Sequence, residues 1–251
     1  MNDMVFYCAE NMEFVIIHNG VLRFNEHSHA ADIVISGITS GNAELVVNES
    51  KRTLDNGEIF TVLPYESHSL TSDKPVDLLT MCIDKALFEQ DKKTYTDFVS
   101  SAIKGLSGKS ELSEVEICLA DKICEEALNI YDDFEAAYLI ETDDLLVKGR
   151  KMLESLPEND DDIQSLADNS FMSKYHYIRR FKAISGLSPN KFRLQNRIRK
   201  AQKLIINGEK IADAAVMSGF YDQSHFDRYF KRIVGVSPKE YINSLRNFVQ
   251  E

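Results

Sequence analysis

The sequence predicts an α+β protein with a β-rich N-terminal part and an all-α C-terminal part. Three observations support this prediction. Residues 1–83 contain short apolar runs between turn residues, the apolar residues recur at helical spacing from about residue 85, and residues 163–251 contain an internal repeat. A length of 251 residues with 43% hydrophobic residues is typical of one large globular domain or two modest ones.

The composition excludes several protein classes. With 11 Gly and 5 Pro the chain is not collagenous, and apolar runs such as Phe14–Ile17 are too short for a transmembrane helix or an export signal. We therefore expect a cytoplasmic protein that does not enter the membrane. The cysteines form no C-x-x-C pair, so we expect reduced thiols rather than a zinc site. They are Cys8, Cys82, Cys118 and Cys124.

The N-terminal strands are predicted from β-branched and aliphatic runs between turns such as Asn19-Gly20 and Asp55-Asn56-Gly57. Several short strands at near-regular spacing indicate a small sandwich or barrel over residues 1–83. The predicted strands are Phe14–Ile17, Asp32–Ile38, Glu44–Asn48, Ile59–Leu63 and Val76–Ile83.

Residues 84–140 form a predicted helical segment that links the two parts or pairs two chains. Its apolar stripe has two candidate partners, its own barrel and a second copy of the chain, and the sequence does not choose between them. The stripe consists of Leu112, Val115, Leu119, Ile123, Ala127 and Ile130. A domain boundary is expected between residues 130 and 145, where Asp143-Asp144 can cap a helix that runs to about Leu156.

The C-terminal part, residues 141–251, contains two copies of one pattern. The segments Arg179-Arg180-Phe181-Lys182 and Arg228-Tyr229-Phe230-Lys231 are 49 residues apart, as are Pro189 and Pro238. The Ala pairs that begin the copies are 48 residues apart, so one copy has a single extra residue. Such a repeat indicates two structurally similar units.

Each copy predicts a helix-turn-helix. Short apolar helices at Ile163–Asn169 and Ile211–Val216 precede tight turns, and second helices follow at Ser173–Ile184 and Asp222–Ile233. Ser173 and Asp222 are suitable N-caps, and Gly219 permits a positive φ in the second turn. A long basic helix joins the copies, with Pro189 in its first turn and Gly208 after its end.

Charge separates the two parts of the chain. The net charge is −11, but residues 1–162 hold 33 acidic and 13 basic side chains, whereas residues 163–251 hold 7 acidic and 16 basic ones. The basic part can attract a polyanion such as double-stranded DNA. The alternative explanation of this charge difference is that the acidic domain docks on the basic one.

The second helix of each copy is expected to present its N-terminal residues to the DNA major groove. Arg suits guanine and Gln suits adenine, while Lys suits phosphate. For Arg179 and Arg228 the alternative is a salt bridge within the domain, and Asp227 can either accept from cytosine or repel phosphate. The candidate DNA-binding residues are Ser173, Lys174, Tyr175, Ile178, Arg179, Lys182, Gln223, Ser224, His225, Asp227, Arg228 and Lys231.

These motifs resemble the DNA-binding domain of the AraC/XylS family of bacterial transcription regulators. The resemblance rests on Ser173-Lys174-Tyr175-His176, Gly186-Leu187-Ser188-Pro189 and Gly219-Phe220-Tyr221-Asp222-Gln223-Ser224-His225-Phe226, among others. It implies an all-α domain with two helix-turn-helix subdomains, and a homodimer and RNA polymerase as further partners. It also implies an N-terminal cupin-like jelly roll that binds an effector. Asp227 departs from the family pattern, which has a small polar residue there.

The N-terminal histidines are the candidate effector site. His27 and His29 share one strand face, and His68, with Gly57 and Pro64 before it, completes a pattern that resembles a cupin-like barrel. Three imidazoles can hold a divalent metal or a haem iron, line an organic-effector pocket, or only cap strands. The nearby carboxylate, Asp32, follows at a shorter spacing than the metal-binding cupin pattern has.

The function predicted from these features is that of a sequence-specific DNA-binding regulator that responds to a small effector and is not an enzyme. One alternative is a metal-dependent cupin enzyme, for which the C-terminal repeat would have no purpose. Another is an effector-binding protein with weak DNA binding, which Asp227 and the acidic N-terminal part favour. RNA binding is disfavoured because paired helix-turn-helix units suit the B-form major groove.

Overall fold

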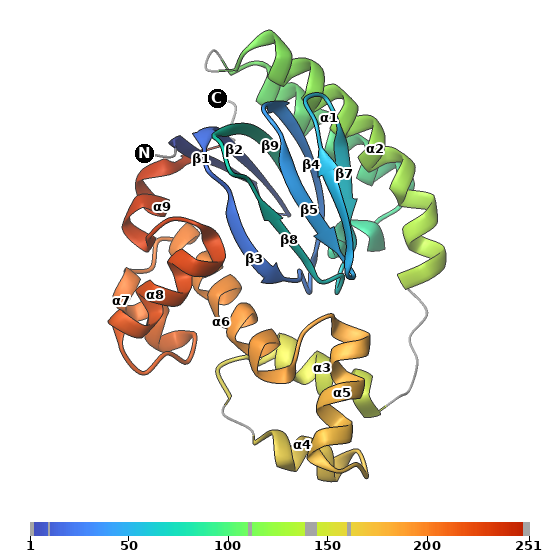
Figure 1. Cartoon of the computed structure of the whole chain (residues 1–251), viewed down its shortest axis with the longest axis vertical. Coiled ribbons are helices and arrows are strands. Elements are labelled where there is room, and N and C mark those ends of the chain that lie inside the picture. Colours follow the sequence, from blue (N-terminus) through green and yellow to red (C-terminus); the bar gives the residue numbers. More distant parts are fainter. Residues whose placement is uncertain (1–2, 10, 110–111, 139–144, 160–161, 248–251) are drawn as a thin grey trace.

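The computed structural model describes residues 3–9, 11–109, 112–138, 145–159 and 162–247. Between residues 3 and 84 the described residues form nine strands that build two facing sheets (Figure 1). The strands are β1 (Asp3–Ala9), β2 (Met12–Gly20), β3 (Arg23–His27), β4 (Asp32–Ser40), β5 (Ala43–Val47), β6 (Ser50–Leu54), β7 (Ile59–Val62), β8 (His68–Thr71) and β9 (Val76–Asp84).

The larger sheet has six strands in the order β10-β1-β2-β9-β4-β7, and the smaller has the order β3-β8-β5-β6. The strand β10 (Leu245–Asn247) comes from the far end of the chain and pairs in parallel with β1, with Leu245 opposite Phe6. The other pairings are antiparallel. The predicted α+β class with an N-terminal β domain is therefore confirmed.

The sequence prediction identified five of these strands and missed β1, β3, β6 and β8. In β3 and β6 most side chains are exposed or half-buried and polar, so hydrophobic alternation does not mark them. The strand β8 has four residues, which gives little pattern to detect. The missed strands matter because β3 and β8 carry two of the three candidate histidines, His27 and His68.

Two helices, α1 (Lys92–Ser107) and α2 (Glu114–Tyr138), follow a short 3-10 helix, η1 (Lys85–Glu89), and cover the outer face of the larger sheet (Figure 1). Leu119, Ile123 and Ala127 of α2 are buried in the core against this sheet. Gly37 on β4 lets the helix approach, because a Cβ there would lie 2.8 Å from the Leu119 side chain. These stripe residues thus pack on their own barrel, while Val115 stays 56% exposed.

The C-terminal part is helical up to residue 244, as predicted. Its helices are α3 (Leu145–Ser155), α4 (Ile163–Asn169), α5 (Lys174–Ser185), α6 (Pro189–Ile206), α7 (Ile211–Met217), α8 (Gln223–Val234) and α9 (Pro238–Ser244). Ser173 and Asp222 cap α5 and α8 as predicted, and Gly186 and Gly235 end these helices with positive φ. The predicted cap Asp143-Asp144 lies outside the described residues.

The two helix-turn-helix units have different cores. We call α4, α5 and their turn the first unit, and α7, α8 and their turn the second unit. The first unit packs with α3 and the start of α6 around Tyr177, Phe181 and Phe192. In the second unit Phe226 and Phe230 belong to one continuous core with the interior of the β domain. Among the described helices none is long and apolar enough to cross a membrane.

Candidate ligand pocket and nucleic-acid interface

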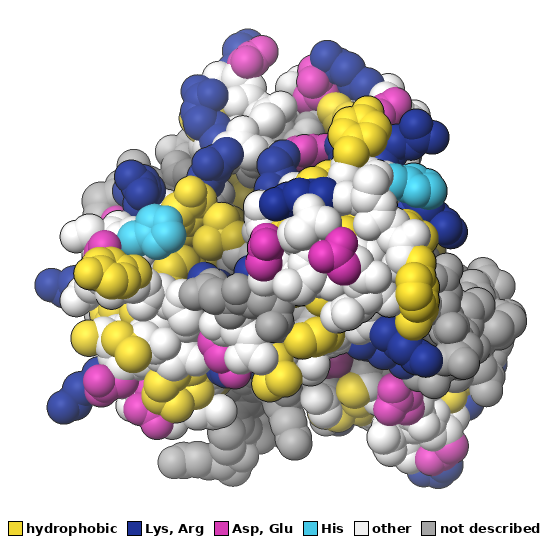
Figure 2. All heavy atoms as spheres, turned by 90° about the horizontal axis from the view of Figure 1, so that it is seen from below, with side chains coloured by type: hydrophobic (Ala, Val, Ile, Leu, Met, Phe, Trp, Pro, Cys, Tyr) yellow, Lys and Arg dark blue, Asp and Glu magenta, His cyan; other side chains and the backbone are white. Residues whose placement is uncertain are grey.

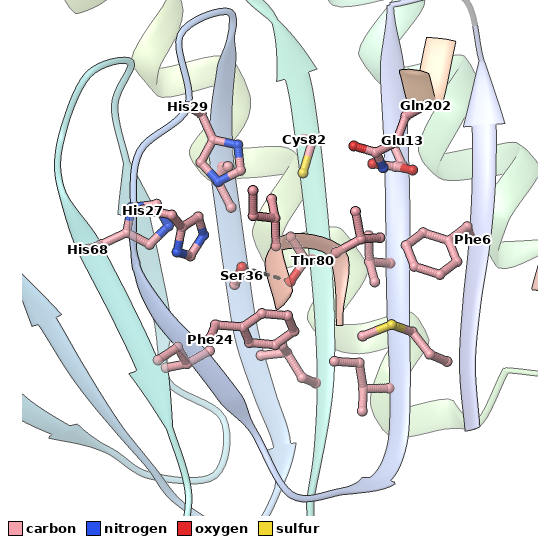
Figure 3. A pocket seen from close by; sticks show the side chains of 18 of the residues that line it. Phe6, Glu13, Phe24, His27, His29, Ser36, His68, Thr80, Cys82 and Gln202 are labelled. Atoms are coloured by element: carbon pink, nitrogen blue, oxygen red, sulfur yellow. Dashed lines mark hydrogen bonds between the residues drawn. The ribbon is translucent and has the colours of Figure 1, made fainter. Parts of the chain in front are cut away.

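The three candidate histidines lie together in the structure. His27 at the end of β3 pairs directly with His68 at the start of β8, and their ring centroids are 4.1 Å apart. His29 lies 5.2 Å from each of them, and Figure 3 shows the three rings gathered at one side of a pocket. Each residue offers one ring nitrogen within 4.8 Å of the others, so the predicted cluster exists.

The hydrogen bonds of His27 and His68 determine which ring nitrogen carries the hydrogen. The His27 Nδ1 lies 2.7 Å from the Asn25 carbonyl oxygen, and the His68 Nδ1 lies 3.1 Å from that of Glu66. A carbonyl only accepts, so each Nδ1 carries the hydrogen and each Nε2 keeps a lone pair. Two imidazoles therefore offer a Nε2 acceptor for a ligand donor or a metal ion.

Burial keeps this cluster uncharged. Burial lowers the pKa of His68 to about 4, and it lowers the pKa of His27 and His29 well below their usual range. The neighbouring histidines act in the same direction on His27, and the Arg199 guanidinium does so on His29. All three imidazoles are neutral at pH 7, which is the form that accepts hydrogen bonds and binds metals.

Arg199 of α6 brings a cation from the helical domain to the histidines. Its guanidinium donates to the His29 Nδ1 at 2.8 Å, and its Nε lies 4.0 Å from an oxygen of Asp32. Asp32 is also 3.5 Å from the His29 Nδ1. The charge on Arg199 is thus balanced by a carboxylate of the β domain, across the boundary between the two domains.

A half-buried acid lies at the other side of the pocket. Burial raises the pKa of Glu13 on β2, and the hydroxyl of Tyr241 on α9 donates to it at 3.1 Å. Figure 3 shows Glu13 and Gln202 of α6 on the side opposite the histidines. The pocket thus has a polar rim to which both domains contribute.

The rest of the pocket is mainly apolar. The cavity leaves about 100 Å³ for the centres of water molecules, and a hydrogen bond of 2.8 Å between Ser36 and Thr80 lies in its wall. Ile233 and Val234 of α8 line it together with side chains of both sheets. The apolar side chains of the β domain are Met4, Phe6, Val15, Ile17, Phe24, Val34, Phe60, Leu70 and Leu78. This lining suits an organic molecule with an apolar body and one polar end.

Further polar contacts join the two domains outside the pocket. Glu26 of β3 binds Lys191 at 2.8 Å and lies 3.6 Å from Lys182, and Lys203 lies 3.3 Å from Asp84. The contact between Glu26 and Lys182 involves a predicted DNA-binding residue, because Lys182 is in that set. In this conformation Lys182 therefore lies against a carboxylate of the β domain.

The other predicted DNA-binding residues line the exposed sides of α5 and α8. Lys174, Tyr175, Arg179 and Arg228 are exposed, and basic side chains with a histidine lie over both units on the face in Figure 2. Gln223, Ser224 and Lys231 are also exposed, whereas Ile178, His225 and Asp227 are half-buried. Burial raises the pKa of Asp227. Ser173 is the N-cap and accepts from the His176 amide.

The pocket residues that come from α6 were not predicted from the sequence. The sequence indicated only that this helix is basic and did not single out Arg199. The available signal was a stripe of Gln195, Arg199 and Gln202 at i, i+4 and i+7, a second polar face beside the apolar one. Gln195 and Gln202 are buried in the structure, and Gln195 accepts from the Ser28 amide at 3.3 Å.

Comparisons with known proteins agree with this architecture. The family model of the AraC-like ligand binding domain matches residues 12–134, and that of a helix-turn-helix domain matches residues 166–244. A curated relative, the uncharacterized HTH-type transcriptional regulator YbfI of Bacillus subtilis (strain 168), is 26% identical over 233 residues, which are 80% of this chain and 81% of the relative.

Solved structures show the same fold. ToxT from Vibrio cholerae O395 is 17% identical, with a TM-score of 0.60 over 94% of this chain and 98% of that chain. The two family models together span both domains, and the family consists of transcription regulators rather than enzymes. This chain belongs to the AraC family of transcription regulators, with an N-terminal ligand-binding domain and a C-terminal helix-turn-helix domain.

Proposed function

We propose that this regulator senses a small organic acid with an apolar body, which binds in the pocket between the two domains. The observation that carries the proposal is Arg199, a cation of the helix that joins the two helix-turn-helix units, beside three neutral histidines of the β domain. A guanidinium pairs with a carboxylate through two parallel hydrogen bonds. The apolar walls suit the remainder of such a ligand.

Two solved ToxT structures support this ligand class. One contains an unsaturated fatty acid, with a TM-score of 0.54 at 18% identity, and another contains (E)-4-(8-methylnaphthalen-1-yl)but-3-enoic acid. Both ligands are carboxylic acids with an apolar body. The similarity supports a related ligand class for this chain, and its own pocket supplies the cation and the apolar lining.

The proposed signal passes through α6. A ligand carboxylate competes with Asp32 and His29 for the Arg199 guanidinium, so it changes how the β domain holds this helix. Because α6 connects the two units, its position sets how both are presented to DNA. A ligand shifts this equilibrium only as far as it binds the two arrangements with different affinity.

The test is binding of decanoate to the full-length protein, measured by calorimetry, with decanol as a neutral analogue. We expect decanoate to bind at least about tenfold more tightly than decanol, since a charged hydrogen bond contributes about 1.5–3 kcal/mol. Arg199→Gln removes that preference. Lys203→Gln is the matched control, because it removes a charge from the same helix outside the apolar pocket. Equal affinity for acid and alcohol would refute the proposal.

A divalent metal is the second candidate ligand. The open Nε2 atoms of His27 and His68 support it, whereas the adjacent Arg199 guanidinium opposes a cation. Zinc or nickel titration of the metal-free protein, with His68→Ala as control, tests this candidate, and an absorption spectrum of the purified protein tests haem. A stoichiometric metal lost with His68→Ala would establish it in place of the acid.

We further propose that the protein acts in the cytoplasm as a homodimer that binds double-stranded DNA and contacts RNA polymerase. The exposed basic side chains of α5 and α8, Arg179 and Arg228 among them, support the DNA interface. Because Leu119, Ile123 and Ala127 pack on their own barrel, a dimer would use the outward side of α2, where Val115 is exposed. Mass photometry with and without decanoate tests the dimer.

A further inference from the structure

The turns of the two helix-turn-helix units have the same backbone geometry but different residues at one position. Met172 donates its amide to the Ala167 carbonyl at 2.9 Å, and Phe220 donates to that of Ala215 at 3.0 Å. The preceding residue is left-handed in both turns, with φ of 55° at Phe171 and 83° at Gly219. Phenylalanine therefore occupies, in the first unit, the position that glycine has in the second.

Phe171 is unfavourable for the folded chain in two ways. A bulky side chain rarely adopts a left-handed backbone, and such strain tends to occur at functional sites. The ring is also 92% exposed, so it gains no packing within the chain. Gly219 has a structural reason, since a Cβ there would lie 2.8 Å from the Glu158 Cα. The strain and the exposure at Phe171 have no such reason among the described contacts.

The second unit has an exposed ring in its turn as well. Its N-cap Asp222 follows Gly219 by three residues, whereas Ser173 follows Phe171 by two. The additional residue is Tyr221, which explains why the repeat spacing changes from 48 to 49 residues. Tyr221 is 96% exposed. Each unit therefore places one solvent-exposed aromatic ring directly before its second helix.

The surroundings of these rings favour DNA as their partner. Exposed cations follow each ring on the next helix, Lys174 and Arg179 in the first unit and Arg228 in the second. Figure 2 shows basic and hydrophobic side chains together over both units. In a helix-turn-helix the second helix enters the major groove with its N-terminal end, which these turns immediately precede. Apolar side chains in that groove contact the methyl group of thymine.

We propose that Phe171 and Tyr221 are specificity-determining residues that pack their rings on thymine methyl groups, one at each end of the binding site. The proposal rests on the DNA-binding function of the family and adds an apolar component to the polar candidate contacts. Contact with DNA buries rings that solvent surrounds in the free protein, and this offsets the strained backbone at Phe171.

The experiment uses the full-length protein and duplexes enriched by the wild type from a random-sequence pool. Each duplex is also made with uracil in place of thymine, which removes only the methyl groups. We expect Phe171→Gly to raise Tm by about 2 °C, because glycine tolerates the left-handed backbone. We expect Phe171→Gly and Tyr221→Ala each to weaken binding about 3- to 10-fold, with an unchanged salt slope since no charge is lost.

The uracil duplexes distinguish a ring contact from an indirect effect. Uracil should weaken binding of the wild type and have a smaller effect on each variant, because the ring that contacts the methyl group is gone. Phe171→Asn should behave like Phe171→Gly, because asparagine also tolerates the left-handed backbone and has no ring. Ile242→Ala on α9 is the control and should behave like the wild type. Wild-type affinity in both ring variants, or an equal uracil effect in all proteins, would overturn the proposal. Loss of transcription activation with unchanged DNA affinity would also overturn it and assign the rings to a protein partner.

Discussion

The two helix-turn-helix units have related sequences but different surroundings. In the first unit, Phe181 packs in a core that α3, α4, α5 and the start of α6 form, with few contributions from the β domain. In the second unit, Phe230 packs in the core that fills the β domain, and its ring lies 5.5 Å from that of Tyr241. The same motif thus forms a nearly separate body in one case and part of the ligand-binding domain in the other.

The difference indicates two routes from the pocket to DNA. Ile233 and Val234 of α8 line the pocket directly, so a molecule bound in the pocket would contact the second unit. The first unit is connected through α6, by Arg199 in the pocket and by Lys191 outside it. The proposed ligand would therefore meet apolar side chains of the second unit and the polar contacts of α6 that lead to the first.

Deleting one core ring in each unit should have the largest effect on stability. It tests whether the two units differ in how they are joined to the β domain. Phe230→Ala and Phe181→Ala each remove a fully buried ring and should each cost about 3–5 kcal/mol locally. Phe230→Ala should also speed hydrogen exchange in the β domain, because the core is shared, whereas Phe181→Ala should affect mainly α3, α4 and α5. Equal spreading of both effects would show that the two units are coupled to the β domain alike.

Lowering the pH should have the next largest effect and should destabilise the second unit before the first. Burial holds the pKa of His68 at about 4, below the value near 6.5 of an unfolded chain, so the unfolded state binds more protons between these values. The contribution of neutral His68 to the free energy of unfolding is full above pH 6.5. It is lost as the pH drops toward 4, by about 3 kcal/mol. Arg199 and Glu13 line the same pocket, and Asp32 lies beside Arg199. Burial raises the pKa of Glu13, which opposes part of the loss.

The expected readout is a pH series of hydrogen exchange. Protection in β3, β8 and α8 should decline before protection in α4 and α5 as the pH falls from 7 to 4.5. His68→Gln, which cannot be protonated, should reduce this difference. A decline that is uniform along the chain would contradict the role of the buried histidine.

The contribution of each unit to DNA binding can be compared with one arginine from each. Arg179→Ala and Arg228→Ala should each cost about 1–3 kcal/mol on duplexes selected by the wild type, and should relax base preference at separate positions. Fluorescence anisotropy with single-base variants of the duplex provides the measurement. Equal loss on random duplexes would identify the side chains as phosphate contacts.

Local sequence signals predicted the helical domain well. Residues that favour a helix start affect only the adjacent first turn of the helix. The starts of α5, α8 and α6 were therefore predicted from Ser173, Asp222 and Pro189 alone. His27 and His29 were predicted as alternate residues on one strand face, which is wrong for His29 because β3 ends at His27 and His29 lies in the loop that follows. His68 was predicted to join them. Of these, His68 was identified from its spacing although its strand was not.

The interdomain parts of the structure were not predictable from local patterns. Arg199 and Glu13 lie 186 positions apart, and nothing near either residue shows that they line one pocket. The pairing of β10 with β1 is hidden for the same reason, since Leu245 follows a helix of the other domain. Burial of a charged side chain depends on its partner, and that partner comes from a distant part of the chain.

The smallest expected effect concerns the surface contact between the β domain and the first unit. Glu26 binds Lys191 and Lys182, and a hydrogen bond from Lys191 is the main reason that the pKa of Glu26 is lowered. These pairs are exposed, so Glu26→Gln should change the free energy of unfolding by less than about 1 kcal/mol. It should still raise DNA affinity about 2- to 4-fold at low salt, because Lys182 becomes available to phosphate.

Glu44→Gln, which removes an exposed pair with Lys51 within the β domain, is the matched control and should leave DNA affinity unchanged. If Glu26→Gln leaves DNA affinity unchanged as well, the first unit is not restrained by this contact, and α6 alone connects it to the pocket.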